Sequence, residues 1–236
     1  MPDASNPPVP AYQDELDVLN DLVPLGSQRI IELGCGAAGL ARSLLKRFPQ
    51  CRVTGLEVDE VQQAKNFASP QEGLEFITSG AQSIPFPDAS FDLAMMLKSL
   101  HHVPLDLMGE ALGEAARVLK KGGHLYISEP VYGGAFNDII KTYNDEGAVR
   151  AAAQGAVDVA LLETDHWANA AELRFTMPVR YGSFDEFERK HMHTSFATYS
   201  VGDTELAAAR AAWDKVAKAD GILFNRIFHV RLLRRR

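Results

Sequence analysis

Three closely spaced glycines, Gly34, Gly36 and Gly39, follow directly after the apolar run at residues 30–33. The run predicts a buried strand, and the leucines at helical spacing after residue 39 predict an amphipathic helix. Glycine permits left-handed backbone and lets a ligand approach the main chain closely. A strand, a glycine-rich turn and a helix in this order are typical of an α/β sheet that binds a ligand at the turn.

The same alternation of strand and helix continues to about residue 130. Strands are predicted at residues 29–33, 52–56, 74–77, 91–97 and 124–128, and helices at 12–22, 40–48, 59–67 and 104–119. In the last helix Leu105 and Met108 are expected to face inward. Short right-handed connections assemble such units into a parallel sheet. The predicted fold class is therefore α/β: a Rossmann-like, doubly wound, mostly parallel seven-stranded sheet with helices on both faces and a small helical cap.

The two ends of the chain depart from this alternation. Four prolines among the first eleven residues predict a flexible leader at 1–11, ahead of a single domain over 12–236. Residues 131–180 combine an Ala-rich helical stretch with a mixed aromatic and charged segment, and we expect them to form a cap over the substrate. Beyond this segment we expect helices at 184–190 and 203–218 and strands at 192–200 and 222–233.

Composition excludes several classes of function. The net charge of −7 gives no general attraction to nucleic acid, and no apolar run approaches the ~20 residues of a membrane helix. The first residues lack a secretory signal, so a cytoplasmic location is expected. Cys35 and Cys51 are too few for a disulfide framework or a zinc cluster, and no metal site is predicted. The helix around Trp213 is predicted to be core or the contact face of a homodimer.

Two nucleotide cofactors are compatible with the glycine-rich turn. The spacing of the glycines satisfies a dinucleotide fingerprint, and Glu57 follows Gly34 by 23 positions, where an acid that binds ribose is expected. However, Glu32 stands at the end of the strand, where it would repel a pyrophosphate. S-adenosylmethionine (SAM) carries a cationic amino group and a sulfonium, which an acid stabilises. The charge of Glu32 therefore favours SAM, and an NAD(P)-dependent oxidoreductase remains the alternative.

Four blocks between residues 29 and 130 resemble the class I SAM-dependent methyltransferases. They are Glu32-Leu33-Gly34-Cys35-Gly36, Val53-Thr54-Gly55-Leu56-Glu57, the loop from Gly80 to Asp92 with Leu100-His101-His102-Val103, and Arg117-Val118-Leu119-Lys120-Lys121-Gly122-Gly123. Three positions depart from the family pattern. Ala38 and Lys121 stand where relatives often carry Gly and Pro, and Gly80 stands where an Asp commonly receives the adenine amino group. We therefore expect Gln82 or a backbone carbonyl to make the adenine contact.

The resemblance implies a set of residues around SAM, with Glu57 binding both ribose hydroxyls. The predicted cofactor-binding residues are Glu32, Gly34, Cys35, Gly36, Glu57, Val58, Ala81, Gln82 and Lys98. Ligands of open α/β sheets bind outside the carboxyl ends of the strands. This rule makes His101, His102 and Tyr132 the candidate catalytic residues, and at most one of the two histidines is expected to reach the substrate.

The predicted function is transfer of the SAM methyl group to an O, N or S nucleophile of a small-molecule acceptor. A SAM-binding protein without independent transfer activity is a further alternative, because the sequence offers no clear catalytic base.

Overall fold

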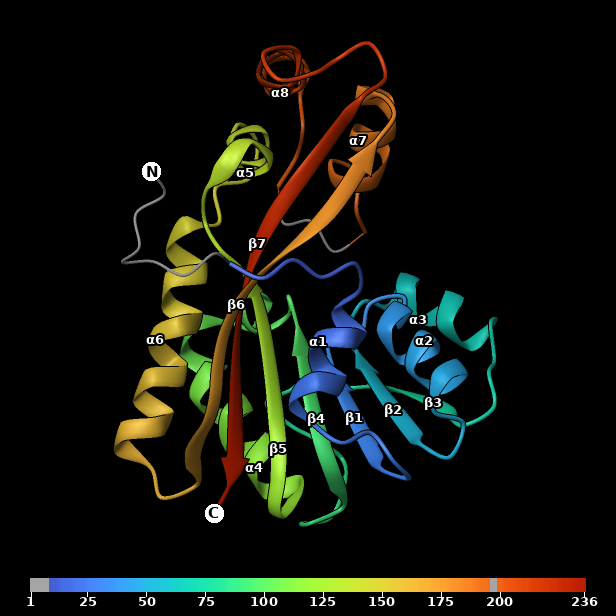
Figure 1. The fold of residues 1–236 in the computed structure, drawn as a ribbon, viewed down its shortest axis with the longest axis vertical. Coiled ribbons are helices and arrows are strands. Elements are labelled where there is room, and N and C mark those ends of the chain that lie inside the picture. The colour runs from blue at the N-terminus through green and yellow to red at the C-terminus, as the bar shows by residue number, and fades with distance from the viewer. Residues whose placement is uncertain (1–8, 196–198) are drawn as a thin grey trace.

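In residues 9–195 and 199–236, which the computed structural model describes, seven strands form one sheet in the order β3-β2-β1-β4-β5-β7-β6 (Figure 1). Neighbouring strands from β3 to β5 are parallel, whereas β7 runs antiparallel to both β5 and β6. The strands are β1 Arg29–Leu33, β2 Arg52–Glu57, β3 Leu74–Thr78, β4 Phe91–Leu97, β5 Leu119–Pro130, β6 Trp167–Tyr181 and β7 Ile222–Arg235. The predicted fold class is confirmed.

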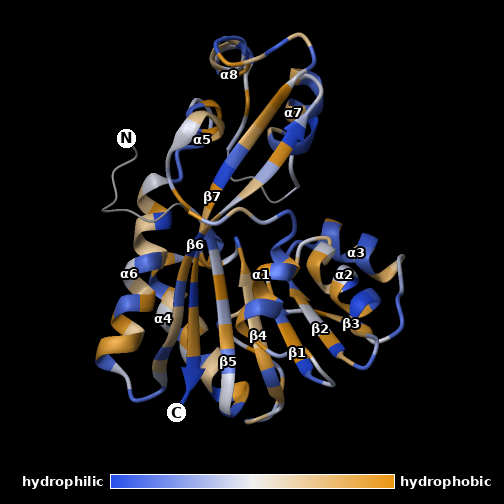
Figure 2. Ribbon diagram, viewed as in Figure 1, coloured by the Kyte–Doolittle hydropathy of each residue, from blue (hydrophilic) through white to orange (hydrophobic). Residues whose placement is uncertain are grey.

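Helices cover both faces of the sheet because successive strand residues point to opposite sides. Ile30 packs in the core that α1 and α2 cover, whereas Ile31 packs in the core that α4 and α6 cover. Figure 2 shows the resulting apolar stripes along the strands. The helices are α1 Glu15–Leu22, α2 Gly39–Arg47, α3 Glu60–Phe67, α4 Met108–Val118, α5 Gly134–Ile140, α6 Gly147–Glu163, α7 Phe184–His191 and α8 Asp203–Asp214, with short 3-10 turns η1 Leu100–His102 and η2 Leu105–Leu107.

The long β6–β7 hairpin continues past the end of β5 and carries a helical lobe (Figure 1). The lobe has its own apolar cluster, in which Phe136 of α5, Phe187 of α7 and Trp213 of α8 pack around the hairpin residues Tyr181 and Phe224. We call this part, α5, α7, α8 and the distal half of the hairpin, the lobe. It stands above the carboxyl ends of the parallel strands.

The segment 131–180, expected to be a cap, is divided between the lobe and the main body. Its first helix, α5, belongs to the lobe, but α6 packs on the sheet beside α4 and the edge strand β6 continues the sheet. The aromatic and charged stretch at 165–181 is therefore largely strand. Trp167 shows why, because its side chain is 1% exposed and fills the core under α6.

Some predicted local structure was wrong. Leu105 was expected to face inward but is 61% exposed, since the chain after Pro104 forms the 3-10 turn η2 before α4 begins. The strand expected at 124–128 is longer than predicted, because β5 runs from Leu119 to Pro130 and includes residues 119–123. The strand expected at 192–200 is absent from its described residues, 192–195 and 199–200, which form turns and bends after α7.

The predicted leader is described only from residue 9. Residues 1–8 lie outside the part of the chain that the structure describes. Pro10 and Ala11 follow the edge of β6: Thr176 N donates to Pro10 O at 2.8 Å and Tyr12 N donates to Thr176 O at 2.9 Å. These bonds attach the described end of the leader to the sheet.

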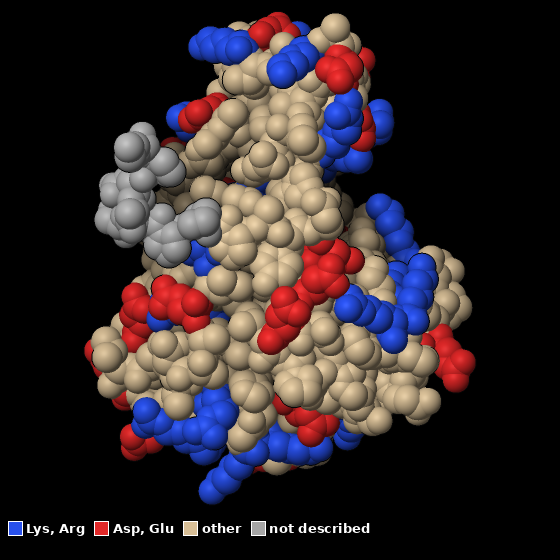
Figure 3. All heavy atoms as spheres, in the orientation of Figure 1, with Lys and Arg blue, Asp and Glu red and all other residues tan. Residues whose placement is uncertain are grey.

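The surface carries both signs of charge. On the face drawn in Figure 3 acidic and basic side chains are interspersed, and basic ones gather near the C-terminus. No helix in the described ranges is long and apolar enough to cross a membrane.

The turn at the tip of the β6–β7 hairpin supplies a test of the lobe. A Cβ at Gly221 would lie 2.1 Å from the carbonyl oxygen of Tyr181, and Gly221 has a φ of +95°. We expect Gly221→Ala to lower the free energy of unfolding by about 1–3 kcal/mol or more, because strained backbone costs this much. Urea unfolding followed by circular dichroism measures the change.

Gly155→Ala is the matched control. Gly155 is exposed in α6, and a Cβ there would meet no atom within 4 Å. This variant should be more stable than wild type by about 0.5–1 kcal/mol, the helix preference for Ala over Gly. A Gly221→Ala variant as stable as wild type would contradict the turn geometry.

Candidate functional site

The glycine-rich turn after β1 is fastened to the end of β2. The amides of Gly34 and Cys35 both donate to the carbonyl oxygen of Leu56, each at 2.9 Å. Gly34 has a φ of +71°, and a Cβ there would lie 2.8 Å from Cβ of Ser99. Glycine is therefore required at this position by conformation and by space.

Further along the turn, Gly36 and Ala38 also have left-handed backbone, with φ of +52° and +54°. A Cβ at Gly36 would meet no atom within 4 Å, so the backbone there is open to a ligand. Ala38, not Gly39, adopts the strained conformation, and Gly39 simply begins α2. The third glycine of the apparent dinucleotide fingerprint, Gly39, therefore does not adopt a left-handed backbone conformation that would require glycine.

Glu57 ends β2 beside the turn and is 8% exposed. Its carboxylate accepts three backbone N–H groups: Gly36 at 2.7 Å, Val58 at 2.8 Å and Asp59 at 2.9 Å. A carboxylate offers about four acceptor positions. A hydroxyl ligand would therefore use the remaining position or replace the amide of Gly36. The next side chain, Val58, is 64% exposed and offers an apolar surface at the same strand end.

Glu32 is a carboxylate without sufficient partners. It is 3% exposed, and its Oε2 atom is buried with no hydrogen-bond partner among the described residues. Burial raises the pKa of Glu32 to about 8, against the opposing effect of the Lys98 ammonium. Lys98 is itself shared, because its Nζ lies 3.2 Å from Oε2 of Glu15. Glu32 therefore holds a proton at neutral pH, and a cationic ligand bound beside it would favour the charged carboxylate.

The predicted adenine-side loop places Gln82 over Gly80. A Cβ at Gly80 would lie 2.4 Å from Oε1 and 2.7 Å from Nε2 of Gln82. The Gln82 amide therefore lies directly against the place where relatives carry an Asp side chain. Ala81 is 7% exposed and packs into the core between these two residues.

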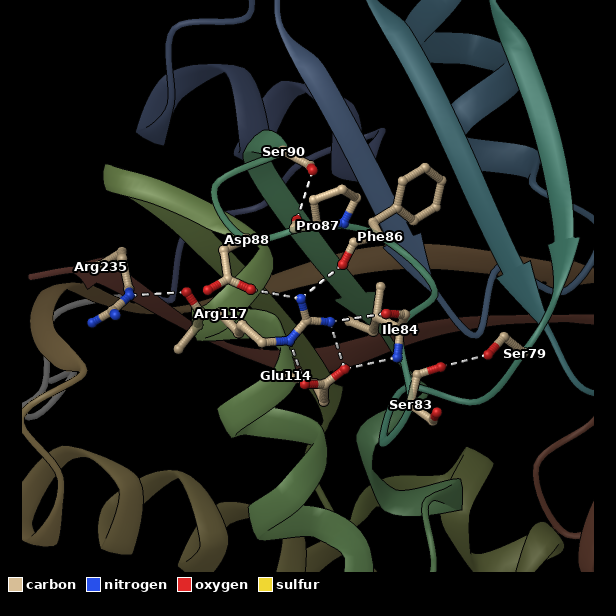
Figure 4. Close-up of polar contacts among 11 residues, drawn as sticks. Ser79, Ser83, Ile84, Phe86, Pro87, Asp88, Ser90, Glu114, Arg117 and Arg235 are labelled. Carbon is tan, nitrogen blue, oxygen red and sulfur yellow. Dashed lines mark hydrogen bonds and ion pairs between the residues drawn. The ribbon is translucent and has the colours of Figure 1, made fainter.

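Arg117 of α4 holds this loop in place (Figure 4). Its guanidinium donates to the carbonyl oxygens of Phe86 at 2.7 Å and Ile84 at 2.9 Å, and to the carboxylate of Asp88 at 2.9 Å. Glu114, one turn earlier, pairs with Arg117 and accepts from the amide of Ile84 at 2.9 Å. An open groove of about 840 Å³ lies beside this network. The side chains of Arg117 and Glu114, which line it, are bound to one another and to the loop. Arg117 is therefore a structural residue.

His101 and Glu129 form a buried pair at the carboxyl ends of β4 and β5. The side chains are 3% and 2% exposed, and Nδ1 of His101 is hydrogen-bonded to Oε2 of Glu129. The other carboxylate oxygen accepts from the amide of Leu100 at 3.0 Å and from that of His101 at 3.4 Å. Glu129 therefore fixes both the backbone of η1 and the orientation of the imidazole, which leaves Nε2 of His101 facing away from the pair.

A second carboxylate faces the opposite side of this imidazole. Oε2 of Glu146 lies 3.9 Å from Nε2 of His101 and forms an ion pair with Arg150, four residues along α6. Burial opposes ionisation of Glu146, but Arg150 and His101 outweigh it and lower the pKa of the carboxyl. Together with His102, these residues bring three potential metal-ligand atoms within 4.8 Å of one another. The Arg150 charge beside Glu146 disfavours a cation there and favours proton chemistry at His101.

Of the two other candidate catalytic residues, His102 lies beside His101 and Tyr132 lies apart from this pair. His102 is exposed, with its ring 4.1 Å from the ring of His101, so the structure buries only the first histidine of the pair. Tyr132 is 45% exposed, and its hydroxyl donates to Asp145 at 2.8 Å. Among the predicted cofactor residues, Cys35 is buried and desolvation strongly raises the pKa of its thiol, which excludes a nucleophilic role at neutral pH.

Sequence reasoning missed Glu146 and Arg150. Their spacing of four residues is the pattern of a helical ion pair, but that pattern is usually an exposed surface feature. Glu129 is placed at a strand end by the sequence, whereas its contact with His101 depends on the pairing of β4 with β5.

Comparison with known proteins finds similarity in the N-terminal part of the chain. Residues 31–127 match the family model described as a methyltransferase domain. A fatty-acid O-methyltransferase of Mycolicibacterium smegmatis is 36% identical over 106 residues, which cover 43% of this chain and 37% of that protein. The chain therefore matches well under half of that relative.

Solved structures extend the likeness of fold to nearly the whole chain. The YcgJ protein of Bacillus subtilis aligns with a TM-score of 0.63 at 17% identity, covering 94% of this chain and 97% of that one. The [4+2]-cyclase SpnF aligns with a TM-score of 0.59 at 22% identity, covering 92% and 78%. The lobe and the antiparallel strands thus belong to a known fold.

The buried Glu32 predicts how stability depends on pH. Between its usual pKa of 4.5 and about 8, the native state keeps a proton on Glu32 that the unfolded state has lost. The free energy of unfolding should therefore fall as pH rises, by about 1.4 kcal/mol per pH unit from this group alone. Urea unfolding of wild type and Glu32→Gln at about pH 6 and about pH 7.5 should show that the variant lacks this fall.

Glu60→Gln serves as the control, because Glu60 is exposed at the start of α3. It should follow the wild-type pH dependence. Parallel curves for wild type and Glu32→Gln would show that Glu32 is ionised in the folded protein.

Proposed function

We propose that this chain is a SAM-dependent methyltransferase that acts on a small-molecule acceptor, because residues 31–127 match the family model described as a methyltransferase domain. The observation that carries the proposal is the pair of acids on either side of the glycine-rich turn. Glu32 has a buried oxygen without a partner, and Glu57 has an acceptor position left beside the open backbone of Gly36. A pyrophosphate would meet the Glu57 carboxylate here and would oppose ionisation of Glu32, whereas SAM offers a cation that favours ionisation of Glu32 and ribose hydroxyls that can donate to Glu57.

The residues present fit SAM by the chemistry of their groups. Glu32 would face the amino group, the backbone of Gly34 and Gly36 the methionine portion, and Glu57 the ribose hydroxyls. Val58 and Gln82 would contact the adenine, with Gln82 in the place of the missing Asp. Lys98 lies close enough to Glu32 to affect its charge and is held by Glu15. When bound, SAM supplies an activated methyl group with its own leaving group.

His101 is proposed to accept a proton from the molecule that is methylated. Glu129 fixes its Nδ1–H, so Nε2 carries the lone pair that takes a proton from a hydroxyl, amine or thiol. The burial of the pair excludes water from the imidazole. Glu146, beside Nε2, stabilises the imidazolium that results, and Arg150 keeps Glu146 ionised. Tyr132 and His102 stay predictions at the rim of this site.

Binding of SAM tests the first part of the proposal. We expect Glu57→Ala to weaken SAM binding at least about 10-fold, since charge-assisted hydrogen bonds contribute about 1.5–3 kcal/mol each. Isothermal titration calorimetry of wild type, Glu57→Ala and the exposed control Glu60→Ala measures the effect. Unchanged affinity in Glu57→Ala, or binding of NADH in place of SAM, would reject the cofactor assignment.

Transfer of the methyl group tests the second part. His101→Gln and Glu129→Gln should each slow single-turnover transfer from labelled SAM by about 10²–10⁴, the usual contribution of a general base. SAM affinity should stay within about 2-fold of wild type, because neither residue is expected to contact the cofactor. His193→Gln is the matched control, because His193 is exposed after α7 and pairs with Glu188. The acceptor panel should contain alcohols, phenols, amines and thiols, which still carry the proton that His101 would remove. Carboxylic acids, suggested by the name of one relative, are already ionised at neutral pH, so transfer to them should not depend on His101. Chelators should not affect the rate if the cluster acts through protons.

A SAM-binding protein without independent transfer activity is the second candidate. The likeness of fold to a [4+2]-cyclase supports it, because a protein with this fold can be named for a different reaction. Tight SAM binding together with no transfer to any member of the panel would favour this alternative.

A further inference from the structure

The inner row of β7 contains one charged residue among apolar ones. Alternate residues of a strand share a face, and Phe224, Phe228, Val230 and Leu232 are all buried on this face. Arg226 occupies the position between the two phenylalanines. Because Pro130 pairs with Phe228, Arg226 lies just beyond the end of β5, where the hairpin leaves the sheet to enter the lobe.

The guanidinium of Arg226 is held by aromatic rings and by no acid. It lies 3.8 Å from the ring centroid of Phe136 and 5.3 Å from that of Phe228. Within residues 9–195 and 199–236, no carboxylate forms an ion pair with it and no oxygen accepts a hydrogen bond from it. Cation–π contacts fix the plane of the group but leave its five N–H donors unused.

A second arginine faces the same cavity. Arg150 and Arg226 both line a cavity of about 180 Å³ between α5, α6 and β7, together with Asn137. Nη2 of Arg150 donates to Glu146 and Nη1 donates to Asn137, but Nε is buried without a partner. Burial and the nearby Arg150 charge lower the pKa of Arg226 to about 10, consistent with a cation that lacks its counter-charge.

The lining residues of this cavity favour a negative ligand. They include two arginines and no Asp or Glu. Of these two arginines, Arg150 has a buried donor without an acceptor, its Nε, and such a donor is costly in a charged group. The guanidinium group matches the two oxygens of a carboxylate or phosphate in a bidentate arrangement. The cavity has the volume of about six water molecules, which is sufficient for such a group with a short carbon chain.

We propose that this cavity is an anchoring subsite in which Arg226, assisted by Arg150, binds an oxyanion group, carboxylate or phosphate, of the acceptor. The inference rests on the proposed function in one respect, which is that the bound anion belongs to the molecule to be methylated. Arg150 links the subsite to the reaction centre, because it also holds Glu146, whose carboxylate faces His101. The apolar parts of Phe136 and Phe224 contact the body of such a ligand.

The test uses three probes of similar size, namely butyrate, butyl phosphate and uncharged butanamide. Nuclear magnetic resonance titrations of the full chain should give at least about 10-fold tighter binding of one or both anions than of butanamide. Arg226→Gln should abolish this preference. Arg226→Lys should retain part of it, because lysine keeps the positive charge but lacks the bidentate geometry of the guanidinium group. Arg174→Gln, which removes an exposed charge from β6, should behave as wild type. Comparison of butyrate with butyl phosphate identifies which oxyanion the site prefers.

Two results would overturn the proposal. One is equal affinity of wild type for the anions and butanamide, which needs no variant and so does not depend on the folding of Arg226→Gln. The other is an anion preference that survives in a folded Arg226→Gln protein. Either result would leave Arg226 as a residue that only packs on Phe136. SAM titration of the same samples separates the two levels: SAM binding without anion preference rejects only the subsite, and anion preference without SAM binding rejects only the proposed function.

Discussion

The hydrogen bonds from Gly34 and Cys35 to the carbonyl oxygen of Leu56 determine the geometry of the whole cofactor half. They join the turn after β1 to the last residues of β2, so Glu57 lies beside Gly36 instead of at a separate strand end. The pairing of Leu33 with Leu56 sets the same register further back and brings Glu32 opposite Gly55. Two acids with different environments, one hydrogen-bonded and one lacking partners, therefore flank a single stretch of open backbone.

A second register, between β5 and β7, determines where the rest of the site lies. Strand β5 ends at Pro130, which pairs with Phe228, while β6 and β7 remain paired as far as Tyr181 and Ile222. The hairpin can extend past the sheet because its two strands satisfy each other's backbone hydrogen bonds. The lobe that it carries supplies Phe136 and Arg226 above the strand ends that supply His101 and Glu129. The proposed subsite and the proposed base are thus joined through Glu146 and Arg150 of the α5–α6 region.

Local pattern was sufficient for the elements that depend on near neighbours. Strand β4 was predicted at its observed bounds because every inward position from Phe91 to Leu97 is apolar. The helix expected at 59–67 is present as α3, whose start depends on near neighbours only, since the Asp59 carboxylate accepts from the amides of Val61 and Gln62. The inward position of Leu105 was wrong. Leu105 has the helical spacing of the buried residues of α4, but the 3-10 turn after Pro104 delays the start of the helix to Met108. The division of residues 131–180 between the lobe and the sheet could not be predicted, because their sequence does not distinguish an antiparallel edge strand from an irregular cap.

Apart from His101, the cluster proposed to be catalytic could not be predicted, because its charges come from distant parts of the chain. Glu129, Glu146 and His101 are each unremarkable in sequence, and only the packing of α6 beside η1 makes a buried imidazole face two carboxylates. Burial of charged side chains is unfavourable unless their charges are balanced, because such a site has little water to solvate them. Arg150 balances Glu146, and an imidazolium would balance Glu129. Arg226 is then the remaining positive charge, and an anionic ligand bound there would leave the buried cluster without a net charge while His101 holds a proton.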